Sequence, residues 1–90
     1  MKVDGVKTIK HTLLYLRESL ANYTKDELGL AIYQKIETQN YKTEEEFVQN
    51  LDAKEVDYLD SLLKEEINYA NSAKDTIRTH QLNEIYELLF

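Results

Sequence analysis

His80 and Glu84 lie four residues apart, so a helix would place both side chains on one face. A pair of this kind can ligate a metal ion, and Asp57 and Asp60 add carboxylates to the same half of the chain. Di-iron bundles carry a Glu-x-x-His motif on two helices, however, and this sequence contains none. We therefore expect no metal ligands, and we interpret the pair as a contact on a solvated helix face.

The carboxylates give no sign of acid–base catalysis. Most Asp and Glu residues fall in the expected first turns of helices or opposite the apolar stripe, and no apolar flanks suggest a raised carboxyl pKa. His11 has no Ser or Asp pattern beside it, and the chain lacks Cys, a Gly-rich phosphate loop and a dinucleotide fingerprint. The sequence therefore predicts no catalytic residues, no cofactor and no enzymatic activity.

The basic residues argue against a nucleic-acid footprint because they are dispersed. Residues 1–24 carry Lys2, Lys7, Lys10 and Arg17 against Asp4 and Glu18, a charge of +2, whereas residues 25–90 carry −8. Binding to DNA requires clustered Lys and Arg to neutralise phosphates. We expect DNA to be an unlikely partner, and the alternative of a DNA-associated protein would have to use this weakly basic N-terminal helix.

Protein is the partner class that an acidic helical surface suits, through steering and contact with a basic surface. The candidate contact residues are Glu44, Glu45, Glu46, Asp52, Asp57 and Phe90. Helix capping and solubility would account for the carboxylates equally well. The apolar end, Leu88-Leu89-Phe90, either docks into the core or remains exposed for a partner or a second copy. The chain is accordingly expected to be a monomer or a weak homodimer.

Composition describes one small domain of 90 residues, numbered 1–90, with a net charge of −6. Pro is absent and Gly occurs twice, so loops should be few and short. No apolar run is long enough to span a membrane, and residues 1–10 lack the apolar stretch of a secretory signal. A cytoplasmic location is the default expectation.

Apolar spacing of three and four residues runs through most of the chain, which predicts helices. Residues 1–6 are expected to fray. Ile9, Leu13, Leu16 and Leu20 form the first stripe, ending near residues 22–24, and no stretch alternates as a strand would. Gly29, within the second predicted helix, either permits close approach of another helix or is neutral.

Helix starts are predicted at three capping boxes, namely Thr24 with Glu27, Thr43 with Glu46, and Asp52 with Glu55. They open helices at about 25–39, 44–51 and 53 onward. One uninterrupted helix over 53–89 would be about 55 Å long at 1.5 Å per residue. A compact chain of this size is only about 25–35 Å across. We therefore expect a bend or break near Asn71-Ser72.

The predicted fold class is all-α, a small irregular bundle of four or five helices. Its predicted core is Leu13, Leu16, Leu20, Leu28, Ile32, Ile36, Phe47, Leu59, Leu63, Ile67, Ile77, Leu82, Ile85 and Leu89.

Several segments resemble a known family. They are YLRESL at 15–20, EEEFV at 44–48, LD at 51–52, EINYA at 66–70 and QLNEIYELL at 81–89. In this order they are similar to the sporulation-specific CsgA proteins of spore-forming Bacillus-type bacteria, which are unrelated to the curli subunit of the same name. The resemblance implies a protein made under sigma-G, often labelled a small acid-soluble spore protein, in the cytoplasm of the forespore or spore core. It implies no site residues, and the label does not by itself imply DNA coating. A non-enzymatic role, structural or through protein contacts, is the function expected.

Overall fold

The computed structural model describes residues 12–39 and 41–90, and within these ranges every regular element is a helix. Residues 12–20 are helical and lead into the short 3₁₀ helix η1 (Ala21–Tyr23). Four more helices follow, α2 (Glu27–Thr38), α3 (Glu44–Gln49), α4 (Ala53–Ser72) and α5 (Thr76–Leu88). The all-α prediction is confirmed. The predicted frayed tail at 1–6, and Lys7, Ile9, Lys10 and His11, lie outside the described residues.

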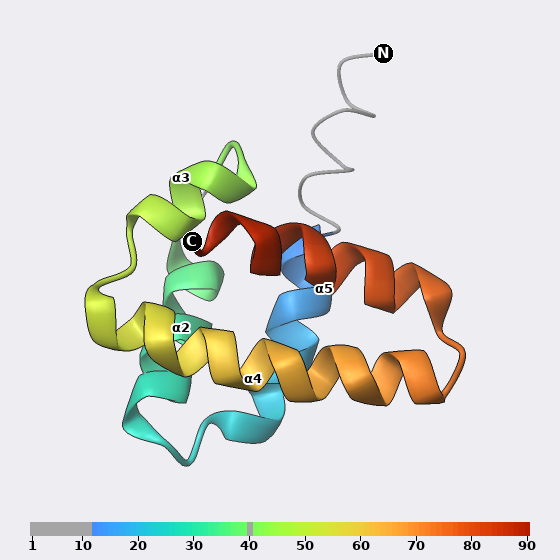
Figure 1. Cartoon of the computed structure of the whole chain (residues 1–90). Helices are drawn as coiled ribbons and strands as arrows, with labels where there is room; N and C mark the ends of the chain where they lie inside the picture. The colour runs from blue at the N-terminus through green and yellow to red at the C-terminus, as the bar shows by residue number, and fades with distance from the viewer. Residues whose placement is uncertain (1–11, 40) are drawn as a thin grey trace.

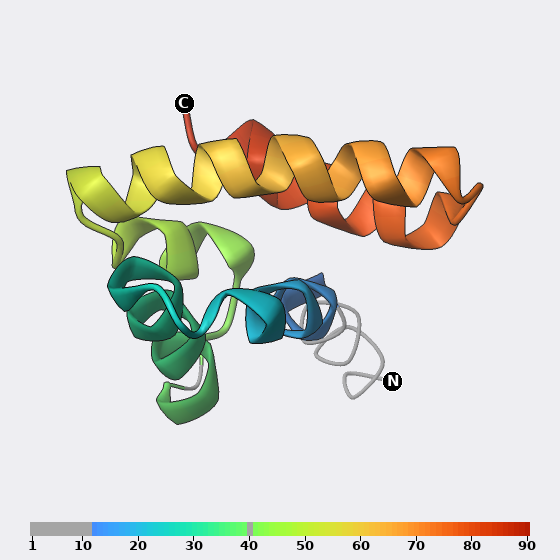
Figure 2. The same cartoon turned by 90° about the horizontal axis from the view of Figure 1, so that it is seen from below.

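The helices form two layers. α4 and α5 run antiparallel as a hairpin, and Figures 1 and 2 show α5 lying beside the second part of α4. The 12–20 helix, α2 and α3 lie against one side of this hairpin (Figure 2), with α3 packed on α5 and α2 packed on α4. The molecule measures 38 × 30 × 23 Å. A single uninterrupted helix over 53–89 would not fit these dimensions, which is why the chain turns back on itself.

One core lies between the two layers. Its completely buried apolar side chains are Leu16, Leu20, Ile32, Phe47, Leu59, Leu63, Leu82 and Ile85, all predicted, and Leu13 and Leu89 are nearly so. Leu28, Ile36 and Ile67 were predicted as core but are only half-buried. Leu62 and Ala70, absent from the predicted set, are buried.

Ile77 is the clear error in the predicted core, since its side chain is 62% exposed. Its spacing from Ala73 suits a continuous helix, but the chain turns between them. The new helix begins at Thr76 and takes its own phase, which puts Leu82, Ile85 and Leu89 inside. Ile77, in the first turn of α5, is left facing outward.

Two of the three predicted capping boxes place a helix start correctly. Asp52 and Glu55 form a complete box, in which the Asp52 carboxylate accepts from the Glu55 N–H at 2.8 Å and Glu55 accepts from the Asp52 N–H at 2.9 Å. Thr43 caps α3 by accepting from the Glu46 N–H at 3.0 Å, although the Glu46 carboxylate reaches the N–H of Lys42 instead of Thr43.

The Thr24 box is wrong. α2 starts two residues later, with Asp26 as its N-cap and no side-chain cap bond, because η1 and a turn extend the preceding helix past Thr24. The Thr24 hydroxyl instead donates to the Ala21 carbonyl oxygen at 3.5 Å.

The predicted break near Asn71-Ser72 is confirmed, since α4 ends at Ser72. Lys74 adopts a left-handed conformation, with φ of 60°, just after the end of α4. The Asp75 N–H donates to the Ala70 carbonyl at 2.8 Å and the Lys74 N–H donates to the Asn71 carbonyl at 3.0 Å. This is the Schellman arrangement, which satisfies the last carbonyls of the helix. Asp75 then caps α5 by accepting from the Arg78 N–H at 3.1 Å.

Gly29 permits a close approach, which was one of the two alternatives left open by the sequence. A Cβ at this position would lie 2.1 Å from the Tyr23 carbonyl oxygen and 2.9 Å from the Tyr58 hydroxyl oxygen. The backbone oxygen of η1 cannot move aside as a flexible side chain would. Gly29 is therefore required for η1 and α4 to close on the start of α2.

Candidate functional site

The predicted acidic residues belong to α3 and to the start of α4, two parts of the chain that lie at the same end of the molecule (Figures 1 and 2). Glu44, Glu45 and Glu46 form the first turn of α3, and Asp52 and Asp57 lie at the start of α4. Two of the five are engaged locally, since Glu46 and Asp52 accept the capping bonds described above. Glu45 and Asp57 are exposed and Glu44 is half-buried.

Glu45 and the chain end meet at a shallow hollow between α3 and α5. Its volume is about 290 Å³ and its lining is Glu45, Val48, Gln49 and Leu88. The two alternatives for the apolar chain end each hold for one residue. Leu89 is buried in the core, and Phe90 is 84% exposed. Asp52 and Asp57 do not line this hollow. Phe90 does not line it either. We call Glu45, Val48, Gln49 and Leu88 the α3–α5 surface.

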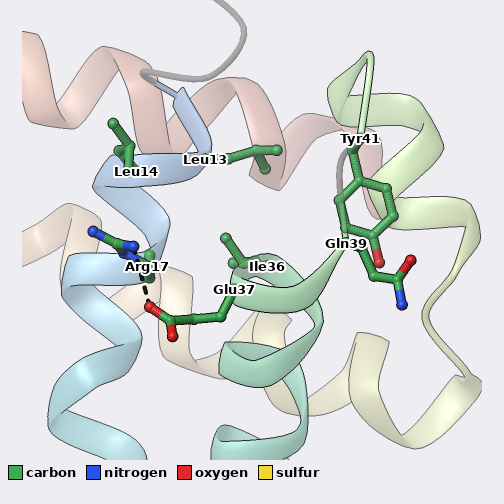
Figure 3. A pocket seen from close by; sticks show the side chains of 7 residues that line it. All are labelled: Leu13, Leu14, Arg17, Ile36, Glu37, Gln39 and Tyr41. Atoms are coloured by element: carbon green, nitrogen blue, oxygen red, sulfur yellow. Dashed lines mark hydrogen bonds and ion pairs between the residues drawn. The ribbon is translucent and has the colours of Figure 1, made fainter.

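A second hollow, of about 240 Å³, lies between the 12–20 helix and the end of α2. Leu13, Leu14 and Ile36 supply its apolar side chains, and Arg17 reaches across to Glu37 at 3.1 Å (Figure 3). Arg17 belongs to the weakly basic segment that the DNA alternative needs. Its guanidinium is paired with a carboxylate of the same molecule, which lowers its capacity to neutralise a phosphate.

Arg78 is held more firmly than Arg17. It donates to Glu18 at 2.9 Å and to Asp75 at 3.3 Å, and its guanidinium lies 5.0 Å from the centre of the Tyr15 ring. Hydrogen bonding to Glu18 is the main cause that raises the pKa of Arg78, with Asp75 adding to it and burial opposing it. This cation fastens α5 to the 12–20 helix, so its role is structural.

Lys35 and Glu55 form the most buried ion pair among the described residues, at 2.7 Å. Lys35 also donates to the Asn50 carbonyl at 2.6 Å, and Glu55 belongs to the α4 capping box. The pair thus joins the end of α2 to the connection between α3 and α4. Lys64 pairs with Asp60 at 3.4 Å along α4.

The described chain therefore has surplus negative charge. Residues 12–90 contain sixteen Asp and Glu against eight Lys and Arg, a net charge of −8. Four of those cations, Arg17, Lys35, Lys64 and Arg78, are already paired with internal carboxylates. The surface is consequently better suited to a basic partner than to a polyanion.

His80 and Glu84 interact as the helix spacing predicts, with 3.2 Å between Nε2 and Oε2 on an exposed face of α5. Residues 12–39 and 41–90 contain no group of three or more His, Asp or Glu side chains placed to hold a metal ion. Asp57 and Asp60 therefore do not complete a site with this pair.

A third feature, which was not among the sequence predictions, consists of two hollows along α4. One of them also borders η1 and the residue that precedes α2. Figure 1 shows η1 and the start of α2 beside α4. The Tyr58 hydroxyl donates to Asp26 at 2.8 Å and the Tyr23 hydroxyl donates to Glu66 at 2.9 Å. Tyr58, Glu65 and Tyr69 recur at helical spacing on this side of α4, and that spacing was the available signal. We name Tyr23, Asp26, Tyr58, Glu65 and Tyr69 the α4 groove.

Comparison with known proteins gives two findings. The family profile of CsgA, described as minor curli fiber component A, matches residues 9–90. A "Sigma-G-dependent sporulation-specific SASP protein" of Bacillus subtilis (strain 168) is 46% identical over 78 residues, which cover 87% of this chain and 95% of that protein. No solved structure matches significantly. Among the described helices, none combines the length and apolar composition that crossing a membrane requires.

Proposed function

Because the chain belongs to the CsgA family and is similar over most of its length to a sigma-G-dependent sporulation-specific protein, we propose that it serves sporulation through contacts with other proteins. Its place of action is the cytoplasm of the forespore or the spore core. It catalyses no reaction in this role. The relationship supports the sporulation context, and the surface supports the mode of action.

The observation that carries the mode of action is the α3–α5 surface. It combines the exposed carboxylate of Glu45 with the apolar side chains of Val48 and Leu88, and the exposed Phe90 follows Leu88 by two residues in the chain. Apolar contact supplies affinity, and the surrounding charge steers a basic partner and discriminates against acidic ones. Glu44, Glu46, Asp52 and Asp57 lie around the same end of the molecule and strengthen its negative potential.

The test is affinity capture from sporulating cells with the wild-type chain and the variant Glu44→Gln/Glu45→Gln/Glu46→Gln. The variant removes three charges but keeps the hydrogen-bond acceptor that Glu46 offers to Lys42. A matched control, Glu27→Gln/Glu84→Gln/Glu87→Gln, removes three exposed charges from α2 and α5. We expect the same partner to be retained by the wild type and the control and lost from the α3 variant.

The contrary results are equally definite. Retention of the partner by the α3 variant would remove the α3–α5 surface from the proposal. A salt-sensitive shift of duplex DNA that Arg17→Gln weakens would replace it with the DNA-associated alternative. Turnover of any substrate by the purified chain would contradict the non-catalytic role.

A further inference from the structure

The α4 groove consists of two neighbouring hollows that have Glu65 in common. The first, of about 170 Å³, is lined by Tyr23, Asp26, Tyr58, Ser61, Leu62 and Glu65. The second, of about 350 Å³, is lined by Glu65, Asn68, Tyr69 and Ser72. From Tyr58 to Ser72 the helix advances about 21 Å at 1.5 Å per residue. The groove is therefore long enough to contact several residues of another polypeptide.

The charged side chains along the α4 groove are all acidic. Asp26, Glu65 and Glu66 border it, and no Lys or Arg is among its lining in the described part of the chain. Burial, the hydrogen bond to Glu66 and the charges of Glu66 and Glu65 raise the pKa of Tyr23 to about 12. The negative charges of Glu65 and Glu66 therefore both act on the Tyr23 phenol, so the two carboxylates lie near the same part of the groove.

The aromatic rings give this surface more than charge. Tyr69 is 70% exposed on α4, and the rings of Tyr23 and Tyr58 form walls of the neighbouring hollow. A Lys or Arg side chain lays its apolar stem on such rings while its charged head meets a carboxylate. The hollow beside α5 is lined by Arg78, and the hollow at the end of α2 is lined by Arg17. The positive charge of each guanidinium would repel a Lys or Arg side chain.

We propose that the α4 groove binds a segment of another polypeptide that is rich in Lys and Arg. This inference rests on the proposed function, because it supplies a second contact surface and the chemistry of its partner. Tyr58, Glu65 and Tyr69 follow one another over about three turns of α4, with Asp26 beside Tyr58. This arrangement matches an extended basic segment better than a compact cation. The same carboxylates repel nucleic-acid phosphates.

The test uses the full chain and a fluorescein-labelled peptide composed of Lys, Arg and Ala, with fluorescence polarisation at low ionic strength. The second probe is the same peptide with Gln in place of Lys and Arg. The groove variant is Glu65→Gln/Tyr69→Ala. Its matched control, Glu84→Gln/Ile77→Ala, removes one exposed carboxylate and one exposed apolar side chain from α5. Circular dichroism verifies that both variants keep the helical content of the wild type.

We expect the basic peptide to bind, the Gln peptide not to bind, and the groove variant to weaken binding by about five- to tenfold. The control should weaken it by less than about twofold, since it changes net charge without touching the groove. Absence of binding to the wild type, equal binding of both peptides, or equal weakening by both variants would each overturn the inference.

Failure of this inference can be told apart from failure of the proposed function. If cellular capture depends on the α3–α5 surface while the groove variant binds the basic peptide normally, only the α4 groove is rejected. If the groove variant alone loses the peptide but capture from sporulating cells retains no partner, the binding chemistry stands and the role in protein contacts is rejected.

Discussion

Two tyrosine hydroxyls link neighbouring helices by hydrogen bonds to carboxylates. Tyr58 on α4 donates to Asp26 at the start of α2, and Tyr23 in η1 donates to Glu66 on α4. For both phenols burial is the largest cause of a raised pKa, followed by the hydrogen bond to the carboxylate, and each pKa reaches about 12. Each bond requires the neutral phenol, so ionisation of these rings is coupled to unfolding.

This coupling predicts a loss of stability at alkaline pH. The folded chain retains the phenolic protons above the ordinary pKa of 10.0, so the contribution is complete below pH 10.0 and disappears as the pH rises through about 12. Urea denaturation should show the free energy of unfolding of Tyr23→Phe/Tyr58→Phe falling less across this interval than that of the wild type. The control Tyr69→Phe, in an exposed ring, should keep the wild-type slope. Equal slopes for all three chains would contradict the coupling.

Helix ends show where sequence reasoning succeeds among the elements. The Thr43 and Asp52 caps depend on groups within three residues, so local spacing was sufficient to find them. The Thr24 box failed because η1 prolongs the preceding helix, an outcome decided by packing around Tyr23 and Gly29. The break after Ser72 could be predicted because one helix over 53–89 would be longer than the molecule is wide. That the break turns the side chain of Ile77 to the outside could not be predicted in this way.

Lys74 stabilises this break less well than glycine would. A residue with a Cβ pays about 1–2 kcal/mol in the left-handed conformation, whereas glycine avoids this cost and loses about 0.5–1 kcal/mol through unfolded-state entropy. We expect Lys74→Gly to raise the free energy of unfolding by about 0.5–1 kcal/mol in urea.

The control for this substitution is Lys64→Gly, in an exposed position within α4. It should lower the free energy of unfolding by about 1 kcal/mol, the usual cost of glycine inside a helix. If both substitutions destabilise the chain alike, Lys74 does not occupy the left-handed position in solution.

At the scale of the whole molecule, stability comes from one core to which every helix contributes. Leu63 of α4 is completely buried, and Ile77 of α5 is largely exposed. Leu63→Ala should cost about 2–5 kcal/mol of unfolding free energy because it leaves a cavity. Ile77→Ala should cost less than about 0.5 kcal/mol of unfolding free energy, although apolar spacing alone predicts both residues to be in the core. Chemical denaturation measures both, and a loss under about 0.5 kcal/mol for Leu63→Ala would contradict the packing.

The candidate surfaces were less predictable than the core. Phe90 could be singled out because it belongs to an unusual apolar chain end, and Glu45 because it belongs to a run of three glutamates. That Glu45 lines a hollow with Leu88 while Asp57 does not depends on how α3 and α5 pack. The α4 groove resembles an ordinary solvated helix face until η1 and Asp26 are brought beside it. A hollow between helices depends on how those helices pack, so it cannot be predicted from the spacing of residues within one helix.

The unequal pairing of acids and bases has a consequence for any complex that this chain forms. With a net charge of −6 and half of the cations in residues 12–90 paired with carboxylates of the same chain, each molecule must be accompanied by an atmosphere of small mobile ions. A docking basic chain would displace some of these ions into the bulk. Part of the driving force for assembly would then be the entropy of the ions set free, and it would be greatest where the surrounding medium is most dilute in salt.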